Sequence, residues 1–486
     1  MVSDLEKQRE ANIERNQKLL RDLQLQELSN AAFGGSPKPK KPASQRSVKA
    51  AQDKKKSTEE LPRRKSRRLE GVKIEDEYDV AKAQLEDEVK LKVERERARK
   101  EGEIKLQQVV GEGKWEQALD ILGSFGSKLS QGDFFDSIPV TDKTLAAARE
   151  EFANLTLDER DFKLTQARIY SIAFHPSAEK PMVLAGDKTG ELGIWDTSRP
   201  DDEGVLSFQT HTGSIATILV DPENPTRIYT ASYDGSVRKL ELPAAKSTEA
   251  FIYDSNPHDP IGVSDIALVD TNTLYYTTLQ GDFGKVDLRA STQKPAQELH
   301  EKKIGGFAVN PMNPYQIATA SLDRTLKVWD IRNEKVELYG QYHSRLSVSA
   351  ASWNTAGQIV CNGYDDTVNV IDIPSDWEMS ENIELQPSVR IKHNCQTGRW
   401  VSIFKARWHE RPRDGIQKFT IGNMKRYIDV FSNTGQQIAH LDGYGMSAVP
   451  AVVQFHRTEN WLAGGTASGK INLFMPSDAK KEVKDE

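Results

Sequence analysis

The sequence predicts an all-β protein, a seven-bladed β-propeller that follows a basic N-terminal extension, part helical and part disordered. Two observations carry this prediction. The last two-thirds of the 486-residue chain contain seven copies of a pattern that ends in Trp-Asp or a variant of it. Successive copies are roughly 42 to 46 residues apart, apart from one interval of about 60, and this spacing is typical of four-stranded propeller blades.

The copies differ in how closely they keep the pattern. The clearest, residues 320–330, reads Ala-Ser-Leu-Asp-Arg-Thr-Leu-Lys-Val-Trp-Asp, and the second clearest is residues 185–196. Aspartate and glycine form the polar turn before each third strand. Seven such WD40 blades close a ring without an exposed edge. The Trp position falls at Trp195, Leu240, Val286, Trp329, Ile371, Phe431 and Phe474, and first strands are expected at 169–174, 215–220, 263–269, 306–309, 348–353, 403–408 and 452–455.

The chain divides into five predicted parts. Residues 1–32 begin with a capping box, Ser3 to Glu6, and continue as an amphipathic helix. Residues 33–74, rich in Pro, Lys, Ser and Gly, form a disordered basic linker. A charged helical region, 75–160, is expected to dock on the propeller. The propeller itself spans 161–476, and residues 477–486 form a charged tail.

The net charge of −6 conceals a strongly basic segment between residues 36 and 70. Such a segment is typical of a nuclear-import signal or a nucleic-acid-binding tail, and a merely solvated linker is the alternative. We therefore expect a nuclear protein. The import signal is expected at Arg63, Arg64, Lys65, Arg67 and Arg68.

Several classes of function are not expected. The chain has no apolar run of membrane-spanning length, and its first residues are too polar for a signal peptide. The two cysteines, Cys361 and Cys395, have no partner at a metal-ligand spacing. Residues 464–470 have the spacing of a phosphate-binding loop, but Ile471 follows where Ser or Thr would bind magnesium. We expect no metal, no cofactor, no small-molecule substrate and no catalytic activity.

One end of the propeller is predicted to be basic. In a meandering blade, the start of the first strand and the turn between the second and third strands lie at the same end. A ring of cations there attracts polyanions, although an ordinary mixed surface is the alternative. The cations gathered in this way are Arg168, Lys302, Lys303, Arg345 and Arg399 from the strand approaches, and Lys188, Arg324, Lys425, Arg426 and Lys470 from the turns.

The long interval between blades five and six indicates an insertion of roughly 15 residues within 375–401. It ends in Gly398-Arg399-Trp400 and is expected to emerge on the basic end. An exposed Trp beside an Arg is suited to stacking on bases or inserting between them. The alternative is that Trp400 covers the sixth blade. At the opposite end, two neighbouring third strands end in Asp-Leu-Arg289 and Asp-Ile-Arg332, which predicts a contact with a partner protein.

These residues together resemble the UV-damaged-DNA-binding propeller family. The resemblance covers residues 168–475 and is strongest at 168–176, 300–304, 321–332, 405–409 and 426–431. It implies DNA binding at the mouth of the ring, with Arg168, Lys188, Lys303 and Arg426 near the DNA backbone. The family inserts a Phe-Gln-His wedge at the lesion, where this chain has Gly398-Arg399-Trp400. The ending at Arg332, and in part that at Arg289, resembles the family's contact with the adaptor of a cullin-type ubiquitin ligase.

The function predicted from the sequence is a nuclear DNA-binding protein that prefers UV-damaged or distorted DNA and acts in the DNA damage response. Duplex DNA is the expected ligand, and single-stranded DNA, a cullin-ligase adaptor and chromatin proteins are further candidates. The alternative is a WD40 scaffold or cullin-ligase substrate receptor that recognises a protein and contacts DNA through its basic tail alone. The predicted DNA-binding residues are Arg168, Lys188, Lys303, Arg345, Arg399, Trp400, Lys425 and Arg426.

Overall fold

The computed structural model describes residues 99–111, 113–124, 137–177, 180–200, 202–254, 260–290, 293–374 and 383–476. All of them belong to the second of two units, 1–74 and 75–486, into which the chain divides. The predicted helix (1–32), linker (33–74), tail (477–486) and import signal (Arg63 to Arg68) lie outside the described residues. Within the described part, no helix has the length and apolar character needed to cross a membrane.

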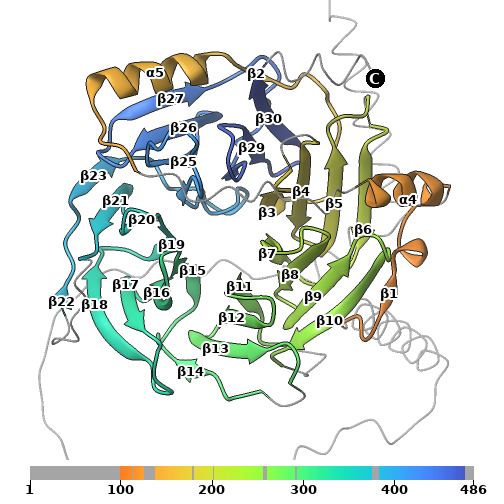
Figure 1. Cartoon of the computed structure of the whole chain (residues 1–486), viewed down its shortest axis with the longest axis horizontal. Coiled ribbons are helices and arrows are strands. Elements are labelled where there is room, and N and C mark those ends of the chain that lie inside the picture. Colours follow the sequence, from red (N-terminus) through yellow and green to blue (C-terminus); the bar gives the residue numbers. More distant parts are fainter. Residues whose placement is uncertain are drawn as a thin grey trace, which may run out of the picture. The chain divides into compact units, whose positions relative to one another are not determined.

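Seven sheets are arranged in a ring around a central axis (Figure 1). Each innermost strand contacts the next, and the last contacts the first, so that the ring closes. The predicted seven-bladed propeller is therefore confirmed. In ring order the innermost strands are β3 (Ile169–Phe174), β7 (Ile215–Val220), β11 (Val263–Leu268), β15 (Ile304–Asn310), β19 (Val348–Trp353), β24 (Arg407–Trp408) and β28 (Val452–Phe455).

Each blade continues outward from its innermost strand as an antiparallel meander. Blade 1 adds β4 (Met182–Asp187), β5 (Glu191–Asp196) and β6 (Val205–Gln209), and blade 2 adds β8 (Arg227–Ser232), β9 (Ser236–Glu241) and β10 (Lys246–Ile252). Blade 3 adds β12 (Thr273–Thr278), β13 (Asp282–Asp287) and β14 (Gln297–Glu298), and blade 4 adds β16 (Asn313–Ser321), β17 (Thr325–Asp330) and β18 (Glu337–His343). Blade 5 adds β20 (Gln358–Gly363), β21 (Thr367–Asp372) and β23 (Val389–Lys392), blade 6 adds β25 (Lys418–Asn423), β26 (Tyr427–Ser432) and β27 (Gln437–Leu441), and blade 7 adds β29 (Leu462–Gly465) and β30 (Ile471–Pro476).

Buried polar networks hold the turns of the blades in place. In blade 4, His300 Nδ1 lies 2.7 Å from Asp323 Oδ2, and its Nε2 lies 2.7 Å from Thr319 Oγ1. The indole N–H of Trp329 donates to the same hydroxyl at 2.8 Å. Each of these buried polar groups of blade 4 thus has a partner, as low-dielectric interiors favour. The network fixes the approach to the first strand against the turn before the third. Blade 2 has a similar arrangement of His211, Asp234 and Thr230.

The outermost strand of blade 7 comes from a distant part of the chain. Strand β2 (Leu155–Leu157) pairs antiparallel with β30, with Leu155 opposite Pro476 and Leu157 opposite Phe474. The repeats predict a propeller that starts at residue 161, yet this blade takes a strand from before that residue. Three residues, Leu-Thr-Leu, are too short for a recognisable period of alternation, so the strand has no local sequence pattern.

Helix α5 (Asp142–Ala153) precedes β2 and covers the outer side of blade 6 beside β27 (Figure 1). Thr141 and Thr144 form a reciprocal cap at its start. The helix buries Leu145, Ala148 and Phe152, and the Phe152 ring meets that of Phe455 edge-on at 6.3 Å. Lys418 is fully buried nearby. Its ammonium lies 5.7 Å from the Phe152 ring and is paired with Asp414. Burial lowers the pKa of Lys418.

A second N-terminal segment packs on blades 1 and 2. Strand β1 (Ile104–Lys105) adds to the edge of β10, and η1 (Leu106–Gln108) and α4 (Trp115–Gly123) follow it. The helix buries Ala118, Ile121 and Leu122 in the core of these two blades. The buried Arg238 donates to the backbone carbonyls of Lys100 (2.8 Å) and Gly102 (2.5 Å), which anchors the segment before β1.

The region around blade 6 differs from the expectation. A first strand was expected at 403–408, but β24 covers Arg407 and Trp408. The side chain of Asn362 explains the difference, because it donates to the carbonyl of Phe404 (2.9 Å) and accepts from the N–H of Ala406 (2.8 Å). It thereby occupies backbone groups that a strand partner would use. Part of the predicted insertion forms β22 (Ile383–Glu384), which pairs in parallel with β18 of blade 4.

Replacing Phe152 with alanine tests how strongly α5 and β2 stabilise the ring. The variant F152A leaves a cavity beside Phe455 and Lys418, and we expect a loss of about 3–5 kcal/mol in the free energy of unfolding. Chemical denaturation followed by circular dichroism measures it. The exposed Lys143 on the same helix gives the control K143A, expected to change stability by less than about 0.5 kcal/mol. Equal stabilities of the two variants would contradict this account.

Candidate nucleic-acid interface

One recurring hydrogen bond fixes which residues share an end of the ring. In blade 1 the backbone N–H of Lys188 donates to the carbonyl of Arg168 (2.9 Å), and in blade 4 that of Leu322 donates to Lys303 (3.1 Å). Each bond joins the turn after the second strand to the residue before the first. The corresponding bonds in blades 2, 3 and 5 run from Tyr233 to Ser214, from Leu279 to Gly262 and from Tyr364 to Ser347. We call this end the basic face and define it by Arg168, Lys188, Lys303, Arg345, Arg399, Lys425 and Arg426.

The cations of the basic face are not neutralised by neighbouring acids. Among the described residues, no carboxylate lies within the 4.0 Å ion-pair distance of any of these seven side chains. Lys470, also predicted for this end, differs because its ammonium is paired with Asp161. Positive charges without a carboxylate partner remain available to an anionic ligand.

A row of contacts begins at Arg399 and Arg168. One terminal nitrogen of the Arg168 guanidinium donates to the carbonyl of Arg399 (2.9 Å), and the other donates to the hydroxyl of Tyr170 (2.8 Å). The same guanidinium lies 5.1 Å from the centre of the Tyr170 ring. The loop before blade 6 is thereby connected to the first strand of blade 1.

The row continues across blades 2 and 4. The Tyr170 and Tyr233 rings meet edge-on at 6.3 Å. The Lys303 ammonium lies 4.6 Å from the centre of the Tyr233 ring and donates to its hydroxyl at 2.8 Å. Sequence analysis did not single out either tyrosine as a site residue. Tyr233 could have been found by its position, because it occupies the same place in its turn as Lys188 does in blade 1.

The loop that ends in Arg399 and Trp400 has a fixed base and an exposed tip. At its base, the N–H of Cys395 donates to Asp366 Oδ1 (2.9 Å). At its tip, Gly398 has a φ of +62° and open space around it. The Trp400 side chain is 78% exposed, so it does not cover the sixth blade, and the Arg399 guanidinium lies 5.4 Å from the centre of its ring.

A second exposed aromatic lies on the approach to blade 7. Tyr444, between Gly443 and Gly445, is fully exposed and precedes β28 as Trp400 precedes β24. Its loop is adjacent to Arg426, which donates to the carbonyl of Ser447 at 3.4 Å. Tyr444 was not among the site residues predicted from the sequence. An aromatic residue between two glycines just before a first strand is nevertheless a usable indication of an exposed aromatic side chain.

Lys405 lies on the same loop as Trp400, beyond Ile403. It is half-buried, and loss of water lowers the pKa of its ammonium to about 8. The carboxylate of Asp265 opposes this shift, whereas the positive charges of Arg407 and Lys303 add to it. Asp265 accepts a hydrogen bond from Thr217 (2.6 Å) and lies 4.0 Å from Arg407. The Asp265 carboxylate therefore lies near Lys405 and Arg407, and Lys303 adds a further positive charge near Lys405.

The base of the same loop contains a Cys-His-Asp arrangement that sequence analysis did not predict. Cys395 Sγ lies 3.6 Å from His393 Nδ1, and His393 Nε2 lies 3.3 Å from Asp429 Oδ2. The geometry resembles that of a thiol nucleophile and its base. However, the thiol is buried, and burial raises the pKa of Cys395 to about 12, so that it stays protonated. The arrangement anchors the loop. Among the described residues, no group of acidic, His and Cys side chains could hold a metal ion.

The two arginines predicted for partner binding lie at the ends of β13 and β17, away from the basic face. Both are exposed, and both are paired with the aspartate two residues earlier. Arg289 donates to both oxygens of Asp287 at 3.0 and 2.9 Å, and Arg332 Nε donates to Asp330 at 2.8 Å. Unlike the cations of the basic face, these arginines already have carboxylate partners.

Comparison with known proteins agrees with the fold and identifies the family. Residues 293–330 match the family described as WD domain, G-beta repeat. Three relatives named DNA damage-binding protein CMR1 are similar over nearly the whole chain. The protein from Scheffersomyces stipitis is 41% identical over 97% of this chain and 99% of its own length. The protein from Phaeosphaeria nodorum is 41% identical over 98% of both chains. The protein from Meyerozyma guilliermondii is 39% identical over 97% of this chain and all of its own length. With this identity over almost its full length, the chain belongs to the family of proteins named DNA damage-binding protein CMR1.

Proposed function

We propose that this chain is a non-enzymatic protein that binds DNA through its basic face and prefers damaged or distorted DNA. The observation that carries the proposal is the row of contacts from Trp400 to Lys303. In it, cations without carboxylate partners lie against aromatic rings across several blades. Phosphates take the cations, and bases stack on aromatic rings. The name of the relatives, DNA damage-binding protein, supports the same ligand.

Binding proceeds in two parts under this proposal. Arg168, Lys188, Lys303 and Arg426 contact phosphates and set the position of the duplex, while Arg345 and Lys425 extend the charged surface. Arg399 and Trp400 then insert at a base step of the duplex. A lesion that weakens stacking lowers the cost of opening that step, which is a few kcal/mol. Preference for damage thus arises from the ease of deforming the DNA.

The nuclear location and the protein partners are part of the proposal. The basic segment that includes Arg63 to Arg68 supports nuclear import. A cullin-ligase adaptor and chromatin proteins are proposed partners, the former at Arg289 and Arg332.

The primary experiment compares UV-irradiated and intact duplexes. Fluorescence anisotropy of the full-length protein with each labelled duplex, over a salt series, is expected to show salt-sensitive binding that favours the irradiated one. Replacing Arg63, Arg64, Lys65, Arg67 and Arg68 with alanine should leave most of this binding intact, whereas K303E should abolish most of it. The reverse pattern would favour a protein-binding scaffold that contacts DNA only through its basic segment.

The salt dependence of binding tests individual phosphate contacts. For K188A and K303A, we expect the slope of log affinity against log salt to fall by about 0.9 for each phosphate that the variant no longer neutralises. Lys188 makes its structural hydrogen bond through the backbone, so K188A preserves the fold. R289A, on the other end of the ring, is the matched control and should keep the wild-type slope. Identical slopes for all variants would remove these lysines from the interface.

Trp400 is predicted to determine preference rather than overall affinity. We expect W400A to lower the ratio of affinities for irradiated and intact duplex by about tenfold, or about 1.4 kcal/mol, with an unchanged salt slope. The control is L119A, which removes an exposed apolar side chain on α4. If W400A reduces binding to both duplexes equally, the side chain does not sense the lesion.

Lys405 makes the proposed binding depend on pH. Its pKa is about 8, so the ammonium is mostly charged at pH 7 and mostly neutral at pH 9. Because DNA attracts the charged form, affinity should fall as pH rises between these values. The variant K405R keeps its charge throughout and should flatten the profile. Parallel pH profiles for wild type and K405R would show that DNA does not sense this charge.

A further inference from the structure

The turn between the second and third strands of each blade contains one residue in the left-handed region of backbone conformation. In four blades this residue is a glycine, with φ between +81° and +108°: Gly190, Gly235, Gly281 and Gly469. In the other three blades it has a side chain, with φ between +59° and +77°: Arg324, Asp366 and Arg426. Glycine adopts this conformation without strain, whereas a large side chain does not.

Backbone hydrogen bonds show that these positions are equivalent. The carbonyl of Gly235 accepts from the N–H of Tyr253 (2.9 Å), just after the fourth strand of blade 2. The carbonyl of Arg324 accepts in the same way from Ser344 (2.9 Å), just after the fourth strand of blade 4. The N–H groups of Gly235, Arg324 and Arg426 each donate to the carbonyl three residues earlier, at 3.3, 3.2 and 2.9 Å. The two arginines therefore stand where other blades have glycine.

Contacts within the protein explain why Asp366 is tolerated at this position. Short polar side chains enter the left-handed region more readily than long ones, because they can form local hydrogen bonds. The Asp366 carboxylate accepts from the N–H of Cys395 (2.9 Å), and its carbonyl accepts from that of His393 (3.0 Å). The strain at Asp366 is thus offset by its hold on the base of the Trp400 loop.

Arg324 has no such compensation. Its side chain is exposed, and its guanidinium makes no hydrogen bond or ion pair with any described residue. Arg426 makes one long hydrogen bond, to the carbonyl of Ser447 (3.4 Å). Arginine at position 324 therefore strains the backbone without a contact in the described part of the chain that would offset the strain. Strained residues of this kind gather at functional sites.

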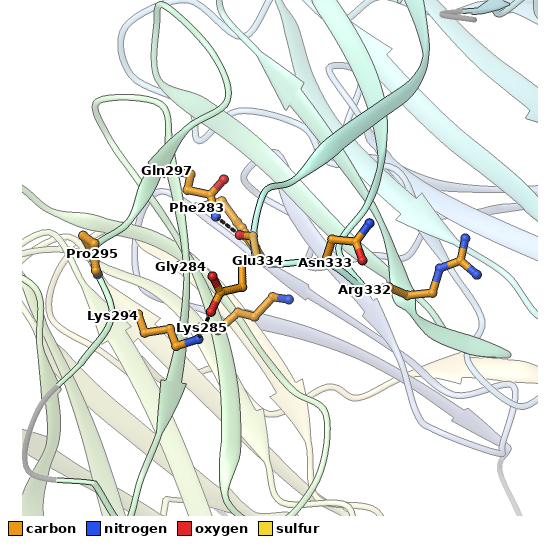
Figure 2. Close-up of a pocket in the computed structure, with 9 residues that line it drawn as sticks. All are labelled: Phe283, Gly284, Lys285, Lys294, Pro295, Gln297, Arg332, Asn333 and Glu334. Carbon is orange, nitrogen blue, oxygen red and sulfur yellow. Dashed lines mark hydrogen bonds and ion pairs between the residues drawn. The ribbon is translucent and has the colours of Figure 1, made fainter. Parts of the chain in front are cut away.

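The cations around the pocket between blades 3 and 4 are different, because each already has a partner (Figure 2). The Lys285 ammonium donates to the carbonyl of Ile331, and Lys294 is paired with Glu334 at 3.0 Å. Arg332 is held by its aspartate. The presence of cations at that pocket is therefore explained within the protein, whereas that of Arg324 is not.

Arg324 also lies next to cations of the basic face. Its turn is joined to Lys303 by the hydrogen bond from Leu322 (3.1 Å). Its carbonyl accepts from Ser344, the residue before Arg345. Lys303 and Arg345 both belong to the basic face, and Arg324 adds a free positive charge beside them. The sequence places Arg324 at this end of the ring, but the predicted DNA-binding residues do not include it.

We propose that Arg324 is a further phosphate-binding residue of the basic face, and that this contact is the reason why blade 4 has arginine instead of glycine in its turn. The guanidinium binds a phosphate of the DNA backbone by charge-assisted hydrogen bonds, and so extends the footprint of the DNA over blade 4. This inference rests on the proposed function, to which it adds one contact.

The substitution R324G tests the inference, because it should change stability and affinity in opposite directions. Relief of the backbone strain should raise the melting temperature of the full-length protein by about 2–4 °C. Loss of the phosphate contact should weaken binding to a labelled duplex by about tenfold and lower the salt slope by about 0.9. Thermal unfolding and fluorescence anisotropy on the same preparation measure the two effects.

Three further variants separate charge from strain. R324Q keeps the strain and loses the charge, so its affinity should fall as in R324G while its melting temperature stays at the wild-type value. R324K keeps the charge and should retain the wild-type salt slope. The control A245G also places glycine at a residue with positive φ (+47°), in the turn between the third and fourth strands of blade 2, at the other end of the ring. It should leave DNA affinity unchanged.

Two results would overturn the role of Arg324 alone. The first is wild-type affinity and salt slope in R324G while the wild-type protein binds DNA. The second is a fall in the melting temperature of R324G, since the arginine would then stabilise its own turn. If the wild-type protein itself does not bind DNA, the proposed function fails and this contact fails with it.

Discussion

The closure of the ring depends on the pairing of β2 with β30. This pairing makes one blade out of a segment that precedes the propeller and the last strands of the chain. It therefore holds the first and last blades together where the ring would otherwise open. The basic face needs this closure, because Arg168, eleven residues after β2, donates to the carbonyl of Arg399 before blade 6. Residues 231 positions apart become neighbours only in a closed ring.

Charge is distributed differently at the two ends of the same scaffold. On the basic face, the polar groups of the backbone and of Asp and Ser side chains complete the turns, and the cations have no acidic partners among the described residues. At the other end, Arg289 and Arg332 are each held by an aspartate two residues earlier. Exposed ion pairs of this kind add little stability. What they change is the local charge, because each of these two arginines is neutralised by its aspartate, whereas the cations of the basic face have no such partner. Under the proposed function, this difference directs DNA to one end.

The sequence predicted the repeated features and the exposed loop at Trp400, and it missed short elements whose partners lie far along the chain. The Trp-Asp endings and the aspartate turns recur in several blades, so the seven blades and the basic end could be read from their spacing. Strands β1, β2 and β22 could not, since two or three residues show no periodicity and their partners lie far along the chain. The late start of β24 was also not predictable, because the side chain of Asn362 bonds to the backbone of Phe404 and Ala406. The contact between Tyr170 and Tyr233 was missed because pairing between blades is a property of the assembled ring, although the position of Tyr233 in its turn was a usable indication.

The exposure of Trp400 bears on how a preference for damage would arise. Such a side chain buries up to about 150–250 Å² on insertion, which at about 25 cal/mol per Å² gives about 4–6 kcal/mol before the cost of ordering it. Opening a base step costs a few kcal/mol, so the two terms nearly cancel on intact DNA. A lesion that removes about 1.4 kcal/mol of stacking free energy then raises the equilibrium constant for inserting Trp400 tenfold. The hydrogen bond at the base of the loop, from Cys395 to Asp366, keeps the entropic cost of ordering this loop small. Arg399, beside the Trp400 ring, supplies charge but no base specificity. Under the proposed function, the mechanical weakness of damaged DNA is therefore what this surface reads.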